Sequence, residues 1–437
     1  MNEKQHLGTK HSRKAGLLSI IPGLGQMYNK QIGKGIIFLA IFALFILFSV
    51  TFGVQAIAGL ITLGTEAGRD HSMFMMVEGT LALILYGIFL IAYGINIYDA
   101  FSVGRLRDYG IKTATSLKEN FSNAWEHGFP YLLTMPAYIL MAFVIIFPVL
   151  VTIFMAFTNY DLYHTPPASL IDWVGFENFF KLFTQASWRQ TFFDILGWTF
   201  IWTIFATIFS IVLGITVAIV SNQSFIKGKR FFRIIFLLPW AVPAFITIMT
   251  FSNMFNDSVG AINTQVIPFF NNMLPFLELT SLPWKTDPFW TKVAVIMIQT
   301  WLGFPYIFVM VTGVLQSIPG DLYEAANIDG ASGWQQFRKI TLPMILFATA
   351  PVLITQFTFN FNNFSLIYLF NAGGPGNIGG GAGSTDILIS WIYKLTTSGT
   401  PQYAVAAAVT LLISSFTILV AYIGFKRSNA FGNEDMM

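Results

Sequence analysis

Long apolar runs separated by short polar segments dominate the chain. A helix needs about 20 mostly apolar residues to cross the hydrocarbon core of a bilayer, and eight runs of this kind are present. They occupy residues 35–54, 76–97, 131–157, 195–220, 231–255, 291–315, 344–369 and 402–425. We therefore predict an all-α fold, a polytopic membrane bundle of about eight transmembrane helices.

The polar segments between these runs carry the basic residues, and their distribution predicts the orientation of the chain. Loops on the cytoplasmic side of a membrane are enriched in Lys and Arg close to the spans. With the N-terminus inside, 18 of the 24 Lys and Arg residues lie in cytoplasmic segments and six lie outside. Both termini are therefore predicted to be cytoplasmic.

The same pattern predicts how the chain is organised. The expected parts are a basic cytoplasmic N-terminal segment (1–34), two transmembrane helices with a cytoplasmic loop (35–130), a six-helix core (131–427) with a polar loop at 320–343, and a cytoplasmic tail (428–437). The first part contains the apolar stretch AGLLSIIPGLGQMYNKQIGKG. We expect an interfacial helix there, held at the membrane surface by Tyr28, Lys30 and Lys34.

Composition supports a protein embedded in lipid and excludes several other classes. Hydrophobic residues make up 55% of the chain and charged residues only 10%, whereas soluble domains contain roughly 25% charged residues. The net charge of +3 is spread over many loops, so we expect no nucleic-acid partner. The chain has no Cys, its five His residues show no metal-binding spacing, and no G-x-x-x-x-G-K-[ST] motif is present. Neither a metal nor a nucleotide cofactor is expected in this chain.

One compact polar stretch, DLYEAANIDGASGW (321–334), interrupts the apolar pattern on the predicted cytoplasmic side. It is typical of two short helices: Asp321 is expected to cap the first, with Glu324 as its capping-box partner, and Ser332 to cap the second. Gly330 suits a left-handed turn between them. On the residues alone, this hairpin is equally compatible with a simple linker between two spans and with a docking element for a soluble partner.

The residues EAANIDGASGWQQFRKITLP resemble the signature loop of the permease subunits of ATP-binding-cassette importers. That signature is E-A-A, three residues, G, nine residues, and then an apolar residue with L-P. In that family the loop forms the coupling helix, which sits in a groove of the cytoplasmic ATPase. The resemblance therefore implies an ATPase-coupling role for Glu324, Ala325, Ala326, Asp329 and Gly330.

Four further segments look like the larger permease subunit of maltose and maltodextrin importers. They are LPWAVPAFITIMTFSNMFN, TWLGFPYIFVMVTGVLQSIP, FTFNFNNFSLIYLFNAGGPG and WVGFENFFKLF, and the similarity runs from about Tyr131 to the C-terminus. The resemblance implies a subunit that translocates maltose/maltodextrin-type oligosaccharides together with a second homologous permease. It also implies two ATP-binding-cassette ATPase subunits that bind the ATP, an external sugar-binding protein, and no enzymatic site in this chain.

The outer loop between the third and fourth spans departs from part of that family. Relatives from bacteria with two membranes carry a large folded insertion there. Here the loop runs only from Thr158 to Asp194. We therefore expect the plasma membrane of a single-membrane bacterium as the location, with a lipid-anchored binding protein outside.

Polar residues at membrane depth mark either a substrate path or contacts between helices. The helical spacing i, i+4, i+7 is occupied by Gln356, Asn360 and Asn363 in the seventh predicted span and by Gln299, Gly303 and Tyr306 in the sixth. Amides both donate and accept hydrogen bonds, as the hydroxyls of a neutral sugar require. Periodicity by itself leaves both interpretations open.

The resemblance to maltose-type permeases favours the substrate path. It implies substrate contacts for Gln299, Leu302, Gly303, Tyr306, Phe359, Asn360, Asn363 and Trp240. Three positions depart from the family pattern, since Gln299 replaces an Asn, Trp240 a Tyr and Ala244 a Ser. These changes leave the sugar open among maltose, longer maltodextrins and another neutral oligosaccharide or polyol.

A secondary transporter is the main alternative class. Proton- or voltage-driven transporters need ionisable groups inside the membrane, whereas Glu78, Asp194 and Arg233 lie near the ends of the predicted spans. Paired carboxylates or a catalytic triad cannot be placed at one depth either, which disfavours a membrane enzyme. Co-purification with a cytoplasmic ATPase distinguishes an importer permease from a secondary transporter.

Overall fold

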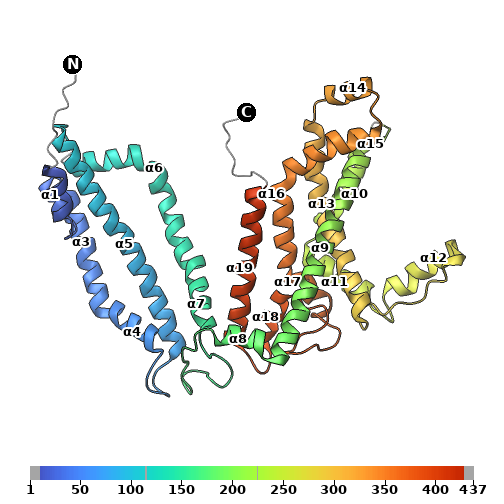
Figure 1. Cartoon of the computed structure of the whole chain (residues 1–437), viewed down its shortest axis with the longest axis horizontal. Coiled ribbons are helices and arrows are strands. Elements are labelled where there is room, and N and C mark those ends of the chain that lie inside the picture. Colours follow the sequence, from blue (N-terminus) through green and yellow to red (C-terminus); the bar gives the residue numbers. More distant parts are fainter. Residues whose placement is uncertain (1–9, 114–115, 224, 428–437) are drawn as a thin grey trace. The chain divides into compact units, whose positions relative to one another are not determined.

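The computed structural model describes residues 10–113, 116–223 and 225–427. Within these ranges the chain is helical and contains no β-strand; two isolated β-bridges pair Thr158 with Trp173 and Gly379 with Ala382. The prediction of an all-α fold is therefore confirmed. The chain forms two compact units, Met1–Gly175 and Phe176–Met437 (Figure 1). The predicted tail, 428–437, lies outside the described residues.

The first unit consists mainly of long apolar helices. Its helices are α1 (Lys10–Leu18), α2 (Leu24–Tyr28), α3 (Ile32–Phe48), α4 (Val54–Thr62), α5 (Ser72–Asp108), α6 (Leu117–Met141) and α7 (Phe147–Ala156). The π-helical turns η1 (Ser49–Gly53) and η2 (Ala142–Ile146) join α3 to α4 and α6 to α7 without a break. Three candidate membrane spans result, Ile32–Thr62, Ser72–Asp108 and Gly128–Ala156.

The N-terminal helices are held to α5 by a buried polar network. Asn96 of α5 accepts a hydrogen bond from the backbone N–H of Gly23 at 3.1 Å and donates from Nδ2 to the carbonyl of Ser19 at 2.9 Å. Asp108, at the end of α5, accepts from the backbone N–H of His11 at 2.8 Å. Helix α1 therefore packs on α5 along one side, and the interfacial location of this segment stays a prediction.

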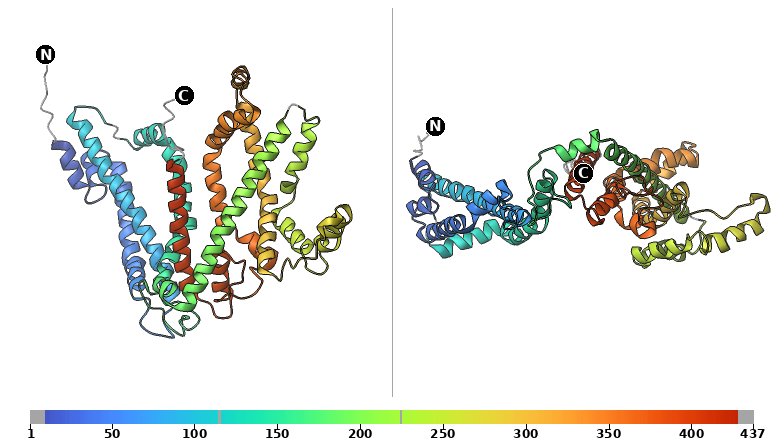
Figure 2. Two further views of the ribbon diagram at one scale, coloured as in Figure 1. Left: turned by 45° about the vertical axis from the view of Figure 1, so that its right-hand side comes forward. Right: turned by 90° about the horizontal axis from the view of Figure 1, so that it is seen from below.

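The second unit contains the remaining helices, and Figure 2 shows its long helices packed side by side. They are α8 (Glu177–Thr184), α9 (Ala186–Asn222), α10 (Lys229–Ala241), α11 (Ala244–Met254), α12 (Ile267–Met273), α13 (Pro288–Ser317), α14 (Asp321–Ile328), α15 (Gly333–Gln336), α16 (Leu342–Phe361), α17 (Phe364–Asn371), α18 (Leu388–Thr397) and α19 (Tyr403–Arg427). Short turns of other helix types complete the unit, namely η3 (Ile262–Val266), η4 (Pro275–Leu277) and η5 (Phe337–Thr341).

Across the described residues, seven helices are long and apolar enough to cross a membrane, and the bent pair α10–α11 raises the number to eight. Each of the eight predicted spans corresponds to one of them, and each observed helix or pair extends further at one end or at both. The bend of 88° between α10 and α11 has a local cause. Pro243 disfavours a helical conformation at Val242, which is extended (φ −112°, ψ 135°) and ends α10.

The boundary between the two compact units falls at Gly175, after three spans. The limits expected from the sequence, at residues 34, 130 and 427, instead group the third span with the later ones. Contacts within the chain define the observed units, whereas span counting and resemblance define the expected parts. Those limits therefore stay predictions.

Small residues bring α9 and α13 into close contact at the centre of the second unit. A Cβ on Gly214 of α9 would lie 2.6 Å from Ile307 Cβ, and one on Gly303 of α13 would lie 2.6 Å from Ser210 Oγ. Such residues let membrane helices approach closely. In the 18-residue apolar stretch of α13, 50% is buried inside the structure. The corresponding share is 6% for the span Ile32–Thr62. Helix α13 is thus the central helix of this unit.

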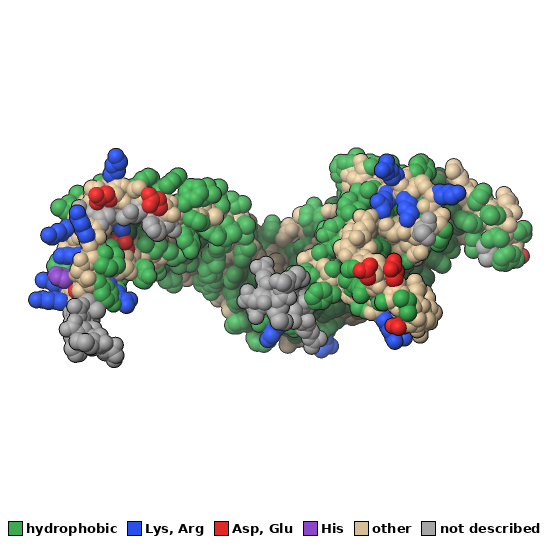
Figure 3. Space-filling view, turned by 90° about the horizontal axis from the view of Figure 1, so that it is seen from above, with side chains coloured by type: hydrophobic (Ala, Val, Ile, Leu, Met, Phe, Trp, Pro, Cys, Tyr) green, Lys and Arg blue, Asp and Glu red, His purple; other side chains and the backbone are tan. Residues whose placement is uncertain are grey.

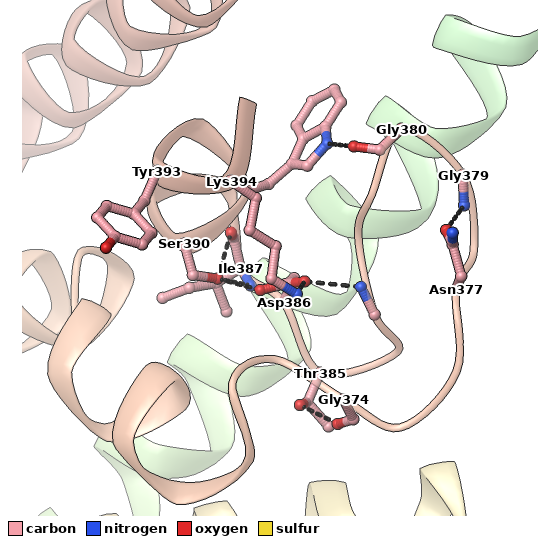
Figure 4. Close-up of polar contacts among 12 residues, drawn as sticks. Gly374, Asn377, Gly379, Gly380, Thr385, Asp386, Ile387, Ser390, Tyr393 and Lys394 are labelled. Atoms are coloured by element: carbon pink, nitrogen blue, oxygen red, sulfur yellow. Dashed lines mark hydrogen bonds and ion pairs between the residues drawn. The ribbon is translucent and has the colours of Figure 1, made fainter. Parts of the chain in front are cut away.

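A buried carboxylate organises the glycine-rich loop between α17 and α18 (Figure 4). Asp386 accepts hydrogen bonds from the backbone N–H of Gly383 and the hydroxyl of Ser390, both at 2.7 Å, and pairs with Lys394 at 2.5 Å. Trp391 of α18 donates from Nε1 to the carbonyl of Gly380 at 3.1 Å. These contacts hold the loop against α18.

The loop before α13 is anchored by a lysine. Lys285 Nζ donates to Ser252 Oγ at 2.7 Å and lies 5.4 Å from the centroid of the Phe370 ring. Burial lowers the pKa of Lys285, although the nearby carboxylate of Asp257 acts in the opposite direction. The contact joins the loop to α11 and α17.

Candidate functional site

A cavity of about 1030 Å³ lies among α10, α11, α13, α16, α17 and α19 of the second unit. Its wall is formed by Pro239, Trp240, Val242, Pro243, Ala244, Ile248, Gln299, Leu302, Gly303, Tyr306, Thr355, Gln356, Thr358, Phe359, Asn362, Asn363, Phe364, Ser365 and Thr417. Its size matches that of cavities that hold small organic ligands. None of the side chains in this wall is charged.

The structure brings together seven of the eight side chains predicted to contact a substrate. They are Trp240, Gln299, Leu302, Gly303, Tyr306, Phe359 and Asn363. They come from α10, α13, α16 and the break before α17, so segments far apart in the sequence meet at one wall. Their contact with a substrate stays a prediction.

Two amides from different helices meet at this wall. Asn363 Nδ2 donates to Gln299 Oε1 at 2.9 Å, and both side chains are at least nine-tenths buried. Asn363 adopts this position because α16 ends at Phe361, which leaves Asn363 as the N-cap of α17. Its Oδ1 accepts a hydrogen bond from the backbone N–H of Leu366 at 3.3 Å. The pair therefore ties α13 to the break between α16 and α17.

Four aromatic side chains give the cavity an apolar surface, namely Trp240, Tyr306, Phe359 and Phe364. Trp240 and Tyr306 have ring centroids 5.8 Å apart, with an angle of 35° between the ring planes. Phe359 on α16 is 59% exposed. Aromatic faces exposed in this way can stack on the apolar C–H faces of a sugar ring.

Asn360 is the predicted contact that lies outside the cavity wall. It is fully buried, its Nδ2 donates to Thr207 Oγ1 of α9 at 2.8 Å, and its carbonyl accepts from Trp202 Nε1 at 2.8 Å. Its Oδ1 is buried and has no hydrogen-bond partner. This arrangement matches the alternative of a contact between helices. A contact of Asn360 with substrate stays a prediction.

Several polar residues in the cavity wall were not singled out from the sequence. They are Thr355, Thr358, Asn362, Ser365 and Thr417. The first three follow one another at i, i+3 and i+7, a spacing that was available as a signal. Thr417 gives no such signal, because it is the only α19 residue in the wall.

The chemistry of the wall suits a neutral ligand rich in hydroxyl groups. Amides and hydroxyls offer both donors and acceptors, and the aromatic rings offer stacking surfaces. An acidic ligand would require cations, and the wall contains none. In the part of the chain that the structure describes, no cluster of three or more His, Cys, Asp or Glu residues is arranged to hold a metal ion.

The polar hairpin forms α14, a turn and α15, and the structure corrects one of its predicted caps. The N-cap of α14 is Gly320, without a side-chain hydrogen bond, and Asp321 is already the first helical residue. The prediction of Asp321 as a capping-box residue is wrong because α14 begins one residue earlier than expected. Two other predictions are confirmed: Gly330 has a left-handed φ of +72°, and Ser332 forms a capping box with Gln335.

The hairpin is braced against the helix that lines the cavity. Tyr323 and Thr341 are joined by a hydrogen bond of 2.9 Å between their hydroxyls, and Gln336 Nε2 donates to Asn327 Oδ1 at 2.6 Å. Helix α15 continues through η5 into α16 without a break. The two hydrogen bonds therefore tie α14 to the helical segment that continues into α16.

The outer surface of the hairpin combines carboxylates with apolar side chains. Of the residues predicted to couple to an ATPase, Glu324, Ala325, Asp329 and Gly330 are exposed and Ala326 is half-buried. Ile328 and Trp334, which were not predicted to take part, are 87% and 67% exposed. Figure 3 shows the carboxylates gathered over the hairpin, beside basic side chains over the start of α10. Such a mixed surface is suited to a protein partner.

Comparison with known proteins places these features in a family. Residues 210–429 match the model of the binding-protein-dependent transport system inner membrane component. The chain is 66% identical to the maltodextrin transport system permease protein MdxF of Bacillus subtilis (strain 168), over 99% of this chain and 100% of the relative. It is 58% identical to the maltodextrin transport system permease protein MalC of Streptococcus pneumoniae serotype 4, over 97% of each chain.

A further relative and a solved structure agree with this assignment. The galactooligosaccharides transport system permease protein GanP of B. subtilis is 51% identical, over 97% of this chain and 100% of the relative. A crystal structure of a bacterial ABC transporter involved in the import of the acidic polysaccharide alginate matches with a TM-score of 0.57 and 21% identity, over 72% of this chain and 100% of that chain; this likeness concerns the fold alone. The chain thus belongs to the binding-protein-dependent inner membrane components, the permease subunits of ABC importers.

Proposed function

We propose that this permease carries maltodextrin-type oligosaccharides across the cell membrane in an ATP-driven importer. The observation that carries the substrate class is the uncharged cavity lined by amides, hydroxyls and aromatic rings. Among neutral sugars, maltodextrins are favoured by two relatives that are named maltodextrin permeases, with 66% and 58% identity over almost the whole chain.

Galacto-oligosaccharides are the second candidate substrate. A permease named for them is 51% identical over 97% of this chain, and the cavity chemistry suits any neutral oligosaccharide. The lower identity places this candidate after maltodextrins.

In the proposed mechanism, an external binding protein delivers the sugar to the cavity in the second unit. A second, homologous permease faces this one, and two ATPase subunits dock on the cytoplasmic side, one of them on α14. Movement of α14 reaches α16 through α15 and η5, and so alters the wall that contains Gln356 and Phe359. This continuity of helices supports alternating access driven by closure of the ATPase subunits.

The remaining roles belong to the partners. ATP is bound and hydrolysed by the ATPase subunits, so this chain acts without a cofactor and without an enzymatic site of its own. The binding of sugar outside belongs to a lipid-anchored protein of a single-membrane bacterium. Both termini of the permease lie in the cytoplasm, as the excess of Lys and Arg on that side indicates.

A competition experiment tests the substrate. Cells that express the complete importer and no other maltodextrin transporter take up labelled maltotriose. An excess of unlabelled maltose, maltohexaose, β-galactotriose or alginate trisaccharide is then added. We expect the two α-glucans to suppress uptake and alginate to have no effect. Suppression by β-galactotriose without suppression by maltohexaose would favour the second candidate, and suppression by alginate would contradict a neutral cavity.

A further inference from the structure

The third span is preceded by a helical arm that the proposed transport mechanism does not use. Helix α6 begins at Leu117, but its membrane-spanning part begins only at Gly128. Pro130 lies inside the helix and removes the backbone hydrogen bond to the carbonyl of Glu126, and α6 changes direction in this region (Figure 1). Residues 117–127 are called the α6 arm below.

The α6 arm has one apolar, aromatic face. Leu117, Phe121 and Trp125 follow one another at i, i+4 and i+8, and Phe129 continues the stripe into the span. The ring centroids of Phe121 and Trp125 are 6.1 Å apart, and those of Trp125 and Phe129 are 5.0 Å apart. All four side chains are at least 41% exposed. In the described part of the chain, this face is therefore left largely exposed.

The opposite side of the α6 arm is polar. Glu119, Ser122 and Glu126 are exposed, and Ser122 Oγ donates to Glu126 Oε1 at 3.3 Å. Lys118 lies beside the aromatic stripe on the helical projection. A helix with this division is amphipathic, with its carboxylates on the side away from the rings.

Both ends of the α6 arm lie at the boundary of a membrane span. At its start, Leu117 packs on Gly33, where a Cβ would lie 2.3 Å from Leu117 Cγ; Gly33 is in the first turn of the span Ile32–Thr62. At its end, the arm runs into the span that begins at Gly128. A straight segment that joins two points at the membrane boundary lies parallel to the membrane surface.

We propose that the α6 arm is an interfacial helix that lies flat on the cytoplasmic membrane surface, with its aromatic stripe inserted into the lipid. Amphipathic helices of this kind bury their apolar face about 5–10 Å into the boundary between headgroups and acyl chains, and Trp is enriched at that depth. The stripe is continuous with the span Gly128–Ala156, whose 18-residue apolar stretch is only 6% buried within the chain. Because that span is left to face lipid, the same lipid covers the stripe. Lys118 can extend past the rings to headgroup phosphates.

The arm therefore fixes the depth and direction of the third span. Sliding the span toward either side of the membrane would pull Phe121 and Trp125 out of the interface or drag Glu119 and Glu126 into it. Both movements are unfavourable, the first because apolar area is exposed to water and the second because charge enters a dry medium.

Cysteine labelling tests this placement, and the chain offers a clean background because it contains no Cys. The full importer carrying Phe121→Cys, Trp125→Cys, Ser122→Cys or Glu126→Cys is labelled with bimane and reconstituted into vesicles of phosphatidylethanolamine and phosphatidylglycerol. Fluorescence is quenched either by lipids with a spin label near the headgroup end of the acyl chain or by iodide in the water. Tyr138→Cys in the span and Tyr163→Cys in an outer loop, 62% and 75% exposed, serve as lipid and water references.

We expect the labels at 121 and 125 to lose fluorescence to spin-labelled lipid, and those at 122 and 126 to lose it to iodide. Iodide quenching at all four positions would overturn the proposal, because the arm would then lie in water. Shielding of 121 and 125 from both quenchers would also overturn it, because a protein partner would then cover the stripe. Only variants that retain maltotriose uptake are labelled, which excludes variants with a misfolded arm from the comparison.

Discussion

The hydrogen bond between Gln299 and Asn363 is the residue-level feature on which the proposed sugar path depends most. It joins two helices at 2.9 Å, and both amides line the cavity. A sugar hydroxyl that replaced or extended this bond would meet a donor and an acceptor already held in place. The pair therefore serves the fold and the proposed site together.

Asn363→Leu should lower maltodextrin uptake about five- to hundred-fold. The substitution leaves a sugar hydroxyl without its partner in a dry site, which costs about 1–3 kcal/mol. Gln356→Leu, a turn or more nearer the start of α16, is the matched control and should have a milder effect. The measurement is the initial rate of labelled maltotriose uptake at equal membrane levels of each variant. Full uptake by Asn363→Leu would remove this residue from the path.

Asn360 allows a separate test of the contact between helices. Thr207→Val should lower the stability of the permease by about 1 kcal/mol, because it leaves Asn360 Nδ2 buried without a partner. The double variant Thr207→Val/Asn360→Leu removes both polar groups and should recover part of the loss. Thermal unfolding in detergent measures both effects. If Asn360→Leu instead abolished uptake at unchanged stability, the residue would belong to the sugar path.

Residue types in the cavity wall could be predicted from resemblance, but the direction of each side chain could not. Asn360 and Asn363 were assigned to one helix face because a continuous helix would align them. The structure ends α16 at Phe361, with Asn362 at φ −111° and ψ 21°. Asn363 therefore bonds to α13 while Asn360 bonds to α9. No Pro or Gly marks this break in the sequence FNFNNFS, so spacing alone gave no warning of it.

At the scale of elements, the hairpin α14–α15 should be sensitive to its turn. Gly330→Pro should abolish uptake while the chain still inserts into the membrane, because φ is +72° at this position and Pro holds φ near −65°. Gly333→Pro is the matched control, since Gly333 is the first residue of α15 and Pro is tolerated there. Uptake and membrane insertion are measured for both variants. Normal uptake by Gly330→Pro would contradict the coupling role.

Local rules predicted the second helix of the hairpin better than the first. Ser332 and Gln335 form a reciprocal cap at the start of α15, which two residues at the correct spacing are enough to specify. The start of α14 depends on the backbone conformation of Pro319 and Gly320, which connect it to the end of α13. The spacing of capping residues does not determine that conformation. Asp321 then lies in the first turn, where its charge still favours the helix through the dipole.

At the scale of the whole molecule, the eight apolar runs were sufficient to predict seven candidate spans and the bent pair α10–α11. The division into two compact units was not predictable in the same way. A span that faces lipid and a span that packs on protein are both apolar, so hydropathy does not distinguish them. The apolar stretch of Ile32–Thr62 is only 6% buried inside the structure, whereas that of Pro288–Ser317 is 50% buried. In the second unit, the small residues Ser210, Gly214 and Gly303 indicate where α9 and α13 approach closely.

The orientation of the molecule is tested with two single cysteines. Ile328→Cys on α14 should be cytoplasmic, and Gly399→Cys, whose Cβ would meet nothing within 4 Å, should be external. A maleimide that does not cross membranes should label position 399 in intact cells, and position 328 only after the cells are permeabilised. The reverse pattern would contradict the orientation and separate the hairpin from any cytoplasmic ATPase.

Uptake of labelled maltotriose into proteoliposomes that contain the complete importer tests the central claim most directly. The vesicles hold this chain, the second permease and the ATPase, with ATP on the side of α14 and the binding protein on the opposite side. The account predicts uptake that requires both ATP and the binding protein, is unaffected by a proton gradient, and is lost with Gly330→Pro but kept with Gly333→Pro. Uptake that a proton gradient drives in the absence of ATP would contradict it.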